Sequence, residues 1–425
     1  MTKRRDFLTL GTGALGALAL SPTLALARDL TRPSALPDDE RFWAQVRKGY
    51  ALDPKLVNLD HGWTNPAPAE AMDVLVRGAR DLESLPADRI PRFWENVTNT
   101  TVRAAIAGAM GVPPGEIALV RNATEALDTV LLGLPLERGD EIVCSAHDYY
   151  AMLDALDQRK ARDGVVLRMV RPPVPAPSLD ALVELYAAAM GPRTKLVLLT
   201  HPSNLTGQLL PVRRIAEAAH RVGAEVVVDG AQSLGLLEDP VTSLGCDYYG
   251  ASLHKWLSAP VGMGVLWMRP EHAGKVWPLV PPGASAKGMG RFEWIGTNPE
   301  YVGPALLPAL EIQRSLGAAR KLARLRYLNQ YWRTRVAAAL PEARFYTNDD
   351  ETMGCGLCLV EVPRADAEAV QKRLRERHGV LVQAMSSGRA EEIKGIRVTP
   401  NVYTSLDEID RFCDKIGEAM RKGMV

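Results

Sequence analysis

The segment that most constrains the fold is an apolar run that ends in an acidic residue, Val226-Val227-Val228-Asp229-Gly230. Consecutive β-branched residues favour a strand, and an apolar run without polar alternation is typical of a strand buried on both faces. A turn residue follows at once, so the carboxylate of Asp229 is expected at the carboxyl end of this strand. Ligands of open α/β sheets bind at that edge. The sequence therefore predicts a buried sheet with a carboxylate at the carboxyl ends of its strands.

A lysine follows in the segment Ser252-Leu253-His254-Lys255, beside a hydroxyl and an imidazole. Taken alone, each residue has an ordinary explanation, because most lysines are solvated and an aspartate at a strand end is often a cap. Together they match what pyridoxal 5'-phosphate (PLP) requires. The lysine forms an imine with the cofactor, and the aspartate keeps the pyridine nitrogen protonated. With Gln232 also in place, the pair Asp229 and Lys255 predicts a PLP enzyme.

A helix N-terminus offers a place for the cofactor phosphate. Asn122-Ala123-Thr124-Glu125 follows the apolar Ile117–Val120 and opens a segment with helical apolar spacing. The first backbone N–H groups of a helix lack partners within the helix, and the helix dipole attracts anions. Ala123 and Thr124 are therefore candidate phosphate ligands. The alternative is an ordinary N-cap, since asparagine and threonine both cap helices well.

These residues resemble class V of the PLP-dependent aminotransferases, which have fold type I, and the resemblance extends over most of the chain. It implies that Asn204 lies near the ring hydroxyl of the cofactor. It also implies that Gly296-Thr297 reaches the phosphate of the neighbouring subunit, so a homodimer is expected and Thr297 is a cofactor ligand. Arg397 matches the arginine that binds the substrate carboxylate, a task that suits its planar guanidinium. The remaining implied cofactor contacts are Ala123, Thr124, Gln232, Ser252, His254 and Lys255.

The family also places an aromatic or imidazole group over the outer face of the cofactor ring. His147-Asp148-Tyr149-Tyr150 follows the expected strand Glu141–Cys144, and Tyr149 is assigned to this stacking position. Tyr150 remains the alternative. His147 could stack as well, although a histidine at a strand end is more often a hydrogen-bonded structural group.

The first 27 residues have the pattern of an export signal. Lys3-Arg4-Arg5-Asp6-Phe7-Leu8 is a twin-arginine pattern, an apolar run follows at Leu8–Leu20, and Ala25-Leu26-Ala27 is a small-residue cleavage site. The twin-arginine route carries folded proteins, which suits an enzyme loaded with its cofactor in the cytoplasm. We expect a periplasmic or exported enzyme with the twin-arginine translocon as a transient partner. An uncleaved anchor is the alternative.

Charge and cysteine content limit the other classes. The net charge of +1 becomes about −1 once the signal is removed, so no basic face for nucleic acid is indicated. The Gly-x-Gly-x-x-Gly pattern at 11–16 lies in the signal without a preceding strand, which disfavours a dinucleotide-binding protein. The five cysteines are an odd number, so at least one is expected to stay unpaired. Cys355 and Cys358 lie three apart at an expected strand, so neither a metal site nor a disulfide is predicted there.

Helical and strand patterns alternate from about residue 66 to 300, which indicates a mostly parallel sheet with helices on both faces. The predicted fold class is α/β, namely the PLP-dependent transferase fold type I with a smaller α+β C-terminal domain. The predicted divisions are a signal at 1–27, an N-terminal segment at 28–65, a large PLP-binding domain at 66–303, and a linking helix with a small domain at 304–425. Within them we expect helices at Leu179–Met190 and Val212–Val222, and strands at Lys195–Leu199, Ala224–Val228 and Leu357–Val362.

The motifs predict the general type of chemistry, but they do not identify the particular reaction. Lys255, its pKa lowered by burial and nearby positive charge, is expected to take a proton from the α-carbon of an amino acid or amino-acid-derived substrate. A cysteine desulfurase is disfavoured because Val382–Gly388, the place of its nucleophile, holds no cysteine. Transamination ranks first, with epimerase, lyase or a non-catalytic PLP-fold protein as alternatives. The pattern is similar to the isopenicillin-N-epimerase-like branch, which includes exported enzymes of siderophore and secondary-metabolite maturation.

Overall fold

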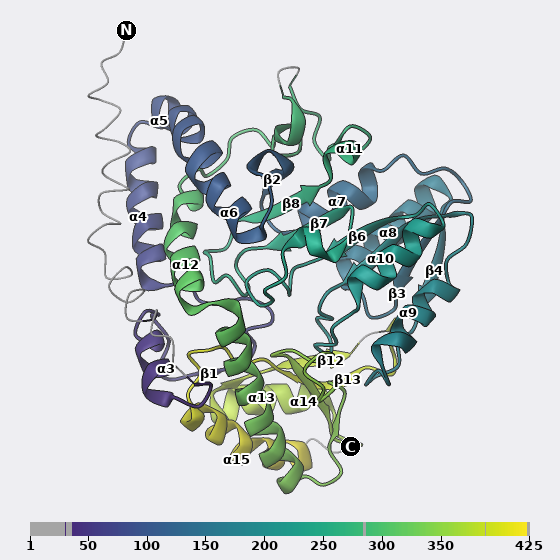
Figure 1. The fold of residues 1–425 in the computed structure, drawn as a ribbon. Coiled ribbons are helices and arrows are strands. Elements are labelled where there is room, and N and C mark those ends of the chain that lie inside the picture. The colour runs from purple at the N-terminus through teal and green to yellow at the C-terminus, as the bar shows by residue number, and fades with distance from the viewer. Residues whose placement is uncertain (1–29, 31–35, 284–285, 387, 423–425) are drawn as a thin grey trace.

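The computed structural model describes residues 30, 36–283, 286–386 and 388–422. The export signal predicted at residues 1–27 lies outside these residues. Figure 1 shows a larger body built on one twisted sheet, with a smaller body below it. The fold-class prediction is confirmed, because the larger body has a mostly parallel sheet flanked by helices and the C-terminal part has an antiparallel sheet of its own.

The large sheet has seven strands, and the inner ones run parallel. Strand β8 is antiparallel to both of its neighbours, whereas the pairs from β7 to β4 are parallel. The strands lie in the order β2 (Ile117–Val120), β8 (Gly264–Met268), β7 (Tyr248–Ser252), β6 (Glu225–Asp229), β5 (Thr194–Thr200), β3 (Glu141–Ser145) and β4 (Val166–Val170).

The valine run of β6 shows why this sheet is buried on both sides. Val226 and Val228 belong to one core cluster and Val227 to the other, because successive side chains of a strand point to opposite faces. All three are fully buried. The first cluster packs beneath α6 (Arg103–Met110), α9 (Leu179–Ala188), α10 (Val212–Arg221) and α12 (Val302–Leu316), and the second beneath α7 (Ala123–Gly133) and α8 (Tyr150–Asp163).

Two helices lead from the large sheet to the small domain, where a single helical stretch was expected. Gly317, with φ +74°, separates α12 from α13 (Ala318–Ala339). This backbone conformation favours glycine and ends the first helix. The small domain has the sheet order β12 (Gln383–Ser386), β13 (Lys394–Val398), β10 (Cys358–Glu361) and β9 (Arg344–Phe345), covered by α14 (Ala367–His378) and α15 (Leu406–Lys422).

The N-terminal segment joins this small domain. Strand β1 (Val57–Asn58) pairs in parallel with β11 (Val380–Leu381), and Asp60 bridges to Thr399. The other elements are α3 (Glu40–Arg47), α4 (Ala69–Glu83), α5 (Pro86–Phe93), the π-helical η1 (Trp94–Val102), α11 (Pro270–Ala273) and the 3₁₀ turns η2 (Pro114–Glu116), η3 (Val241–Leu244) and η4 (Gly288–Phe292).

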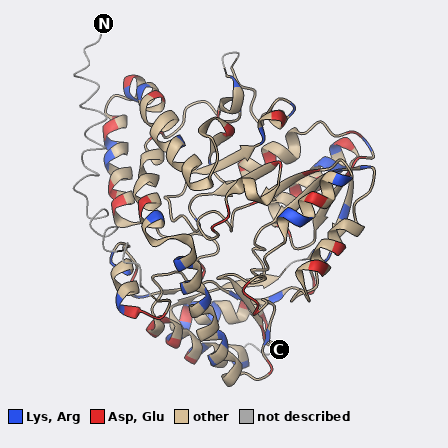
Figure 2. Cartoon of the chain, in the orientation of Figure 1, with Lys and Arg blue, Asp and Glu red and all other residues tan. Residues whose placement is uncertain are grey.

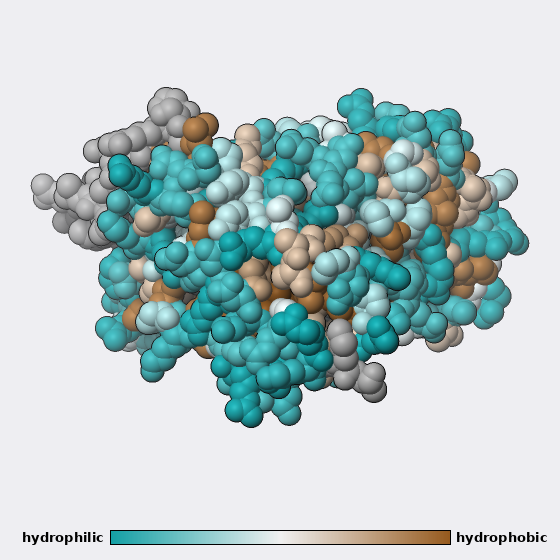
Figure 3. Space-filling view, turned by 90° about the horizontal axis from the view of Figure 1, so that it is seen from below, coloured by the Kyte–Doolittle hydropathy of each residue, from teal (hydrophilic) through white to brown (hydrophobic). Residues whose placement is uncertain are grey.

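All five cysteines are free and buried, as expected for structural residues. Cys355 and Cys358 pack into different hydrophobic clusters, so their side chains do not face one another. Charged residues of both signs alternate along the outer helices (Figure 2). The face seen from below is mostly hydrophilic, with apolar residues in patches (Figure 3). Within the described residues, no helix is long and apolar enough to cross a membrane.

Candidate active site

A cavity of about 170 Å³ lies at the carboxyl ends of the central parallel strands. Asp229 ends β6, Thr200 ends β5, and the two are register partners, so both reach the same edge. Every predicted site residue except Thr297 lines this cavity. These residues are Ala123, Thr124, Tyr149, Asn204, Asp229, Gln232, Ser252, His254, Lys255 and Arg397.

Lys255 and Asp229 act on one another electrostatically within this cavity. Burial lowers the pKa of Lys255 to about 8, and the charge of Asp229 opposes that shift. Burial raises the pKa of Asp229, and the charge of Lys255 opposes it. Asp229 also accepts the backbone N–H of Ala231 over 3.0 Å, which fixes one carboxylate oxygen. An amine with this pKa is partly neutral near pH 7 and can act as a nucleophile and base.

The N-terminus of α7 opens into the cavity. Asn122 caps this helix, because its side-chain oxygen accepts the N–H of Glu125 over 2.9 Å. The N–H of Ala123 is donated to Oγ of Ser252 over 2.8 Å, which joins the helix to the end of β7. Thr124 lies between these two bonded N–H groups and lines the cavity. Asn122 is thus the N-cap, and Thr124 remains available to an anion.

Arg397 comes from β13 of the small domain, across the cavity from β6. It donates one Nη to the carbonyl of Asn204 over 2.9 Å and the other to Oδ1 of Asp60 over 2.8 Å. Its Nε is buried without a hydrogen-bond partner within the described part of the chain. Gly62 lies against the guanidinium, since a Cβ there would be 3.3 Å from its Cζ.

The two adjacent tyrosines have different surroundings. The Tyr149 ring lies 5.9 Å from Nζ of Lys255 and lines the cavity, whereas Tyr150 is 65% exposed and does not line it. Their rings contact each other at 4.5 Å. His147 bonds Glu392 over 2.8 Å, as a structural histidine would. This arrangement favours Tyr149 over Tyr150 for the stacking role, which stays a prediction.

Some neighbours of the site carried no recognisable sequence signal. Asn65 donates its side-chain amide to the carbonyls of His61 and Lys255, the latter over 2.7 Å. Lys321, from α13, is 3% exposed and bonds the carbonyl of Trp256 next to Lys255. Both side chains hold the backbone that carries the lysine. Each lies far from Lys255 in sequence, so only the fold brings them to it.

Thr297 lies outside the cavity. It is exposed and borders a separate surface hollow of about 1030 Å³, together with Ile90, Trp94 and Trp294. A still larger hollow, of about 1080 Å³, lies between α6 and α12, and Lys255 does not line it. The chemistry-bearing residues are therefore gathered in the smallest of these three spaces.

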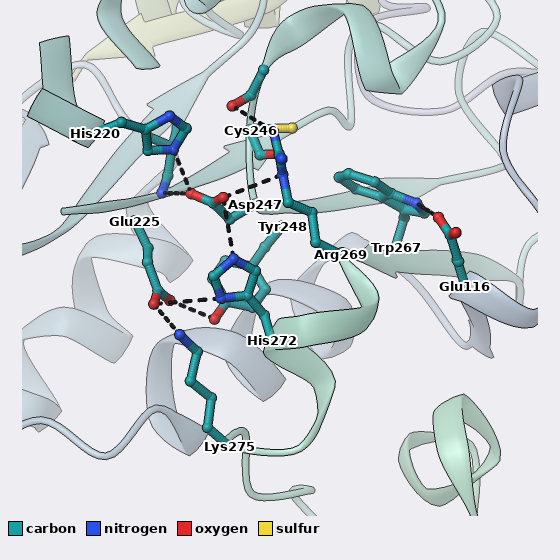
Figure 4. A network of polar contacts seen from close by, with 12 residues as sticks. Glu116, His220, Glu225, Cys246, Asp247, Tyr248, Trp267, Arg269, His272 and Lys275 are labelled. Carbon is teal, nitrogen blue, oxygen red and sulfur yellow. Dashed lines mark hydrogen bonds and ion pairs between the residues drawn. The ribbon is translucent and has the colours of Figure 1, made fainter. Parts of the chain in front are cut away.

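A second polar cluster lies at the opposite end of β6 (Figure 4). There Asp247 accepts from Nε2 of His220 over 2.9 Å and from the N–H of Val226 over 2.7 Å, and Glu225 accepts from the Tyr248 hydroxyl over 2.6 Å. These contacts fasten helices and loops to the amino ends of the strands. Within the described residues, no group of histidine, cysteine and carboxylate side chains has an arrangement that could hold a metal.

Orphaned polar atoms show that the cavity fits PLP. Nδ1 of His254 and Oδ1 of Asn204 are buried without a hydrogen-bond partner among the described residues, and both side chains line the cavity. Burial lowers the pKa of His254 to about 4, so its imidazole is neutral. Unpaired buried polar atoms are costly unless a ligand satisfies them. A helix terminus for phosphate, a lysine amine and a buried carboxylate complete the donor set.

The fold and this site define a PLP-dependent enzyme of fold type I. The apo structure of a cysteine desulfurase from Thermococcus onnurineus NA1 superimposes with a TM-score of 0.76 at 22% identity, over 92% of this chain and 99% of that one. At this identity the likeness concerns the fold alone.

Sequence comparison gives the family. The chain belongs to the aminotransferase class-V family, whose match covers residues 57–412, and PLP is the cofactor of this family. It is similar to isopenicillin N epimerase of Streptomyces clavuligerus, 30% identical over 88% of this chain and 97% of that protein. The isopenicillin N epimerase of Amycolatopsis lactamdurans is 34% identical over 88% and 98%.

Proposed function

We propose that this enzyme removes a proton from the α-carbon of an amino acid or amino-acid-derived substrate whose carboxylate binds Arg397. The observation that carries the proposal is the meeting of Lys255, Asp229 and Arg397 in one cavity. A proton-accepting amine, a buried carboxylate and a carboxylate-binding guanidinium are what such chemistry requires.

Each residue has a task that follows from its surroundings. When bound, PLP supplies an aldehyde that reacts with amines and a ring that withdraws electrons from the α-carbon. Lys255, with its lowered pKa, accepts the α-proton and returns it. Asp229 would hold its negative charge toward the ring nitrogen, and the N-terminus of α7 with Thr124 would bind the phosphate. Asn204 orients Arg397 through its carbonyl.

Two reactions fit this proposal, and they differ in where the proton returns. Transamination is the first candidate on the family's base rate. Epimerisation is the second, and it is favoured by the two relatives named isopenicillin N epimerase. Desulfuration has little support, because all five cysteines are buried, and burial raises the pKa of each thiol. A buried thiol of raised pKa is a poor nucleophile.

One experiment tests the proposal and separates the candidates. The purified holoenzyme is incubated with a panel of amino acids and amino-acid-derived compounds while keto acid, D-isomer and ammonia are assayed. Keto acid with conversion of the cofactor to its amine form supports transamination, and D-isomer with unchanged cofactor supports epimerisation. Borohydride reduction and peptide mapping should place the pyridoxyl group on Lys255. Its recovery on another lysine would refute the assignment of the site.

We further propose that the working unit is a homodimer in which Thr297 contributes to the cofactor phosphate site of the neighbouring subunit. Thr297 is exposed, lies outside its own cavity and borders a hollow with apolar side chains, including Trp294, which is 48% exposed. Mixing Thr297→Ala and Lys255→Ala subunits tests this. A hybrid dimer has one intact site only if Thr297 acts on its neighbour, so activity should return on mixing. Without such recovery, Thr297 has no role across subunits.

Export through the twin-arginine route is part of the same proposal, and a periplasmic substrate of secondary metabolism, such as a siderophore precursor, would suit it. The support is the sequence of residues 1–27 alone. Replacing Arg4 and Arg5 by lysine should retain the enzyme in the cytoplasm, as judged by cell fractionation. Unchanged export of that variant would remove this part of the proposal.

A further inference from the structure

The guanidinium that we assign to the substrate carboxylate already has a carboxylate beside it. Nη2 of Arg397 donates to Oδ1 of Asp60 over 2.8 Å, and the side chains are 6% and 14% exposed. A pair this well shielded interacts more strongly than a surface ion pair, because little water screens it. The positive charge of Arg397 is therefore largely balanced before any substrate arrives.

The backbone holds Asp60 in this position. Its N–H donates to the side chain of Asn58 over 2.9 Å, and the residue forms a β-bridge with Thr399, two positions after Arg397. Farther along the same segment lie Gly62, which packs on the guanidinium, and Trp63, which lines the cavity. Asp60 does not itself line the cavity, but its backbone is fixed and its carboxylate is held against Arg397, which does line it.

Arg397 lines the cavity, and its guanidinium is only partly occupied by partners within the described residues. One Nη bonds Asn204 and the other bonds Asp60, while Nε has no partner within the described residues. A substrate carboxylate bound there would share one guanidinium with Asp60. Two carboxylates at one cation repel each other, and the repulsion is relieved if one of them is protonated.

We propose that Asp60 is a specificity-determining residue that competes with the substrate carboxylate for Arg397 and takes up a proton from water when that carboxylate binds. The inference rests on the proposed function, because it assumes that Arg397 binds the carboxylate. It names a second proton-carrying group at the site besides Lys255. It also means that the site binds carboxylates more weakly than an unpaired arginine would.

The charged groups that face Asp60 support this role. Burial raises the pKa of Asp60, and the charges of Arg397 and Lys255 oppose that shift. Its sequence neighbour His61 adds no charge, since burial lowers the pKa of that imidazole to about 3. A substrate carboxylate would cancel much of the effect of Arg397, and Asp60 would then hold a proton at higher pH. Carboxylate affinity should therefore fall as pH rises through the titration of Asp60.

Acetate binding to the holoenzyme tests the inference without requiring turnover. Calorimetry in two buffers of different ionisation enthalpy gives both the affinity and the number of protons taken up, over roughly pH 5 to 8. The variants are Asp60→Asn, which keeps shape and removes charge, and Asp60→Ser as a second replacement. The matched control is Asp53→Asn, which makes the same charge change at an exposed position of the same segment. Arg397→Gln reports whether acetate binds at this site at all.

The wild type and Asp53→Asn should take up protons and bind acetate less tightly as pH rises. Asp60→Asn should show neither the proton uptake nor the fall of affinity with pH. At the upper end of the pH range it should bind acetate on the order of tenfold more tightly than the wild type. Unchanged proton uptake in the Asp60 variants would overturn the inference, and so would the absence of uptake in the wild type. If acetate binds neither wild type nor variants while amino acids are still turned over, the carboxylate clamp is refuted and the α-carbon chemistry stands. If the wild type binds acetate with the expected proton uptake but turns over none of the tested amino acids, only the proposed function is refuted.

Discussion

Trp256 donates its indole N–H to Oε1 of Gln232 over 2.8 Å, and Gln232 donates its own amide to the carbonyl of Gly62 over 2.8 Å. The first residue follows Lys255, the second lies just after Asp229, and the third lies against Arg397. The amide of Gln232 therefore spans the segments that carry the three residues on which the proposed chemistry depends. Its role as a cofactor ligand remains a prediction, since both ends of the amide are bonded within the protein.

Replacing Trp256 by phenylalanine should lower stability. Gln232 is 2% exposed, and its Oε1 would lose its donor; an unsatisfied buried group of this kind costs about 1–3 kcal/mol. Denaturant unfolding of the holoenzyme measures the loss. Trp277→Phe is the matched control, because that side chain is 72% exposed and should change stability by less than about 0.5 kcal/mol. Equal effects of the two replacements would show that the Trp256 bond does not matter.

Removing the Tyr149 ring should weaken cofactor binding, whereas removing the Tyr150 ring should not. Tyr149 lines the cavity beside Lys255, and an aromatic stacking contact is worth about 0.5–1.5 kcal/mol, or up to roughly tenfold in affinity. Equilibrium binding of PLP to Tyr149→Ala and Tyr150→Ala gives the comparison. If Tyr150→Ala binds PLP more weakly than Tyr149→Ala does, the residue that stacks on the ring is Tyr150 and not Tyr149.

Asp229→Asn should retain the fold and most of the bound cofactor but react slowly. Asparagine can still accept the N–H of Ala231, so the local turn is preserved, while the negative charge beside the ring is lost. Losing one electrostatic partner at a reacting centre commonly costs ~10²–10³ in rate. The measurement is the turnover number on whichever substrate the panel identifies. Turnover close to that of the wild type would place Asp229 away from the ring nitrogen.

Lys321 should make stability depend on pH. Burial lowers its pKa from 10.5 to about 7 in the folded chain. Between these two values the unfolded chain binds a proton that the folded chain does not, so the unfolding free energy should rise with pH. The slope from this residue is at most ~1.4 kcal/mol per pH unit.

Lys321→Met should reduce that slope, as followed by denaturant unfolding at several pH values. Lys160→Met, at an exposed position of α8, is the control and should leave the slope as it is. A slope identical in wild type and Lys321→Met would mean that the buried amine keeps its ordinary pKa.

The sequence was most informative where local patterns decide structure. The valine run before Asp229 predicted a buried strand ending at a ligand site, and β6 ends at that residue. Ala123 and Thr124 are predicted to hold a phosphate, with an ordinary N-cap as the alternative; the structure shows that Asn122 caps α7, and the phosphate site stays a prediction. The break at Gly317 was missed, because the apolar spacing continues across it and one glycine is a weak signal.

Contacts between distant segments could not be predicted. Nothing in the sequence near Asp60 indicates an ion pair with Arg397, because the pair forms only when β13 lies beside the N-terminal segment. Asn65 and Lys321 escaped notice for the same reason. The family resemblance supplied Arg397 itself, but it carried no information about which carboxylate faces it in this chain.

The pairing of β1 with β11 joins residues 57–58 to residues 380–381, and beyond these strands Gly62 and Arg397 line the cavity together. Closing so long a loop carries an entropic cost that must be met before these contacts can form. During synthesis, β1 therefore cannot pair with β11 until nearly the whole chain has left the ribosome. A chain cut before β13 would keep Asp229, Lys255 and the α7 terminus but would lack Arg397, so the residues assigned to the cofactor are synthesised before the residue assigned to the substrate carboxylate.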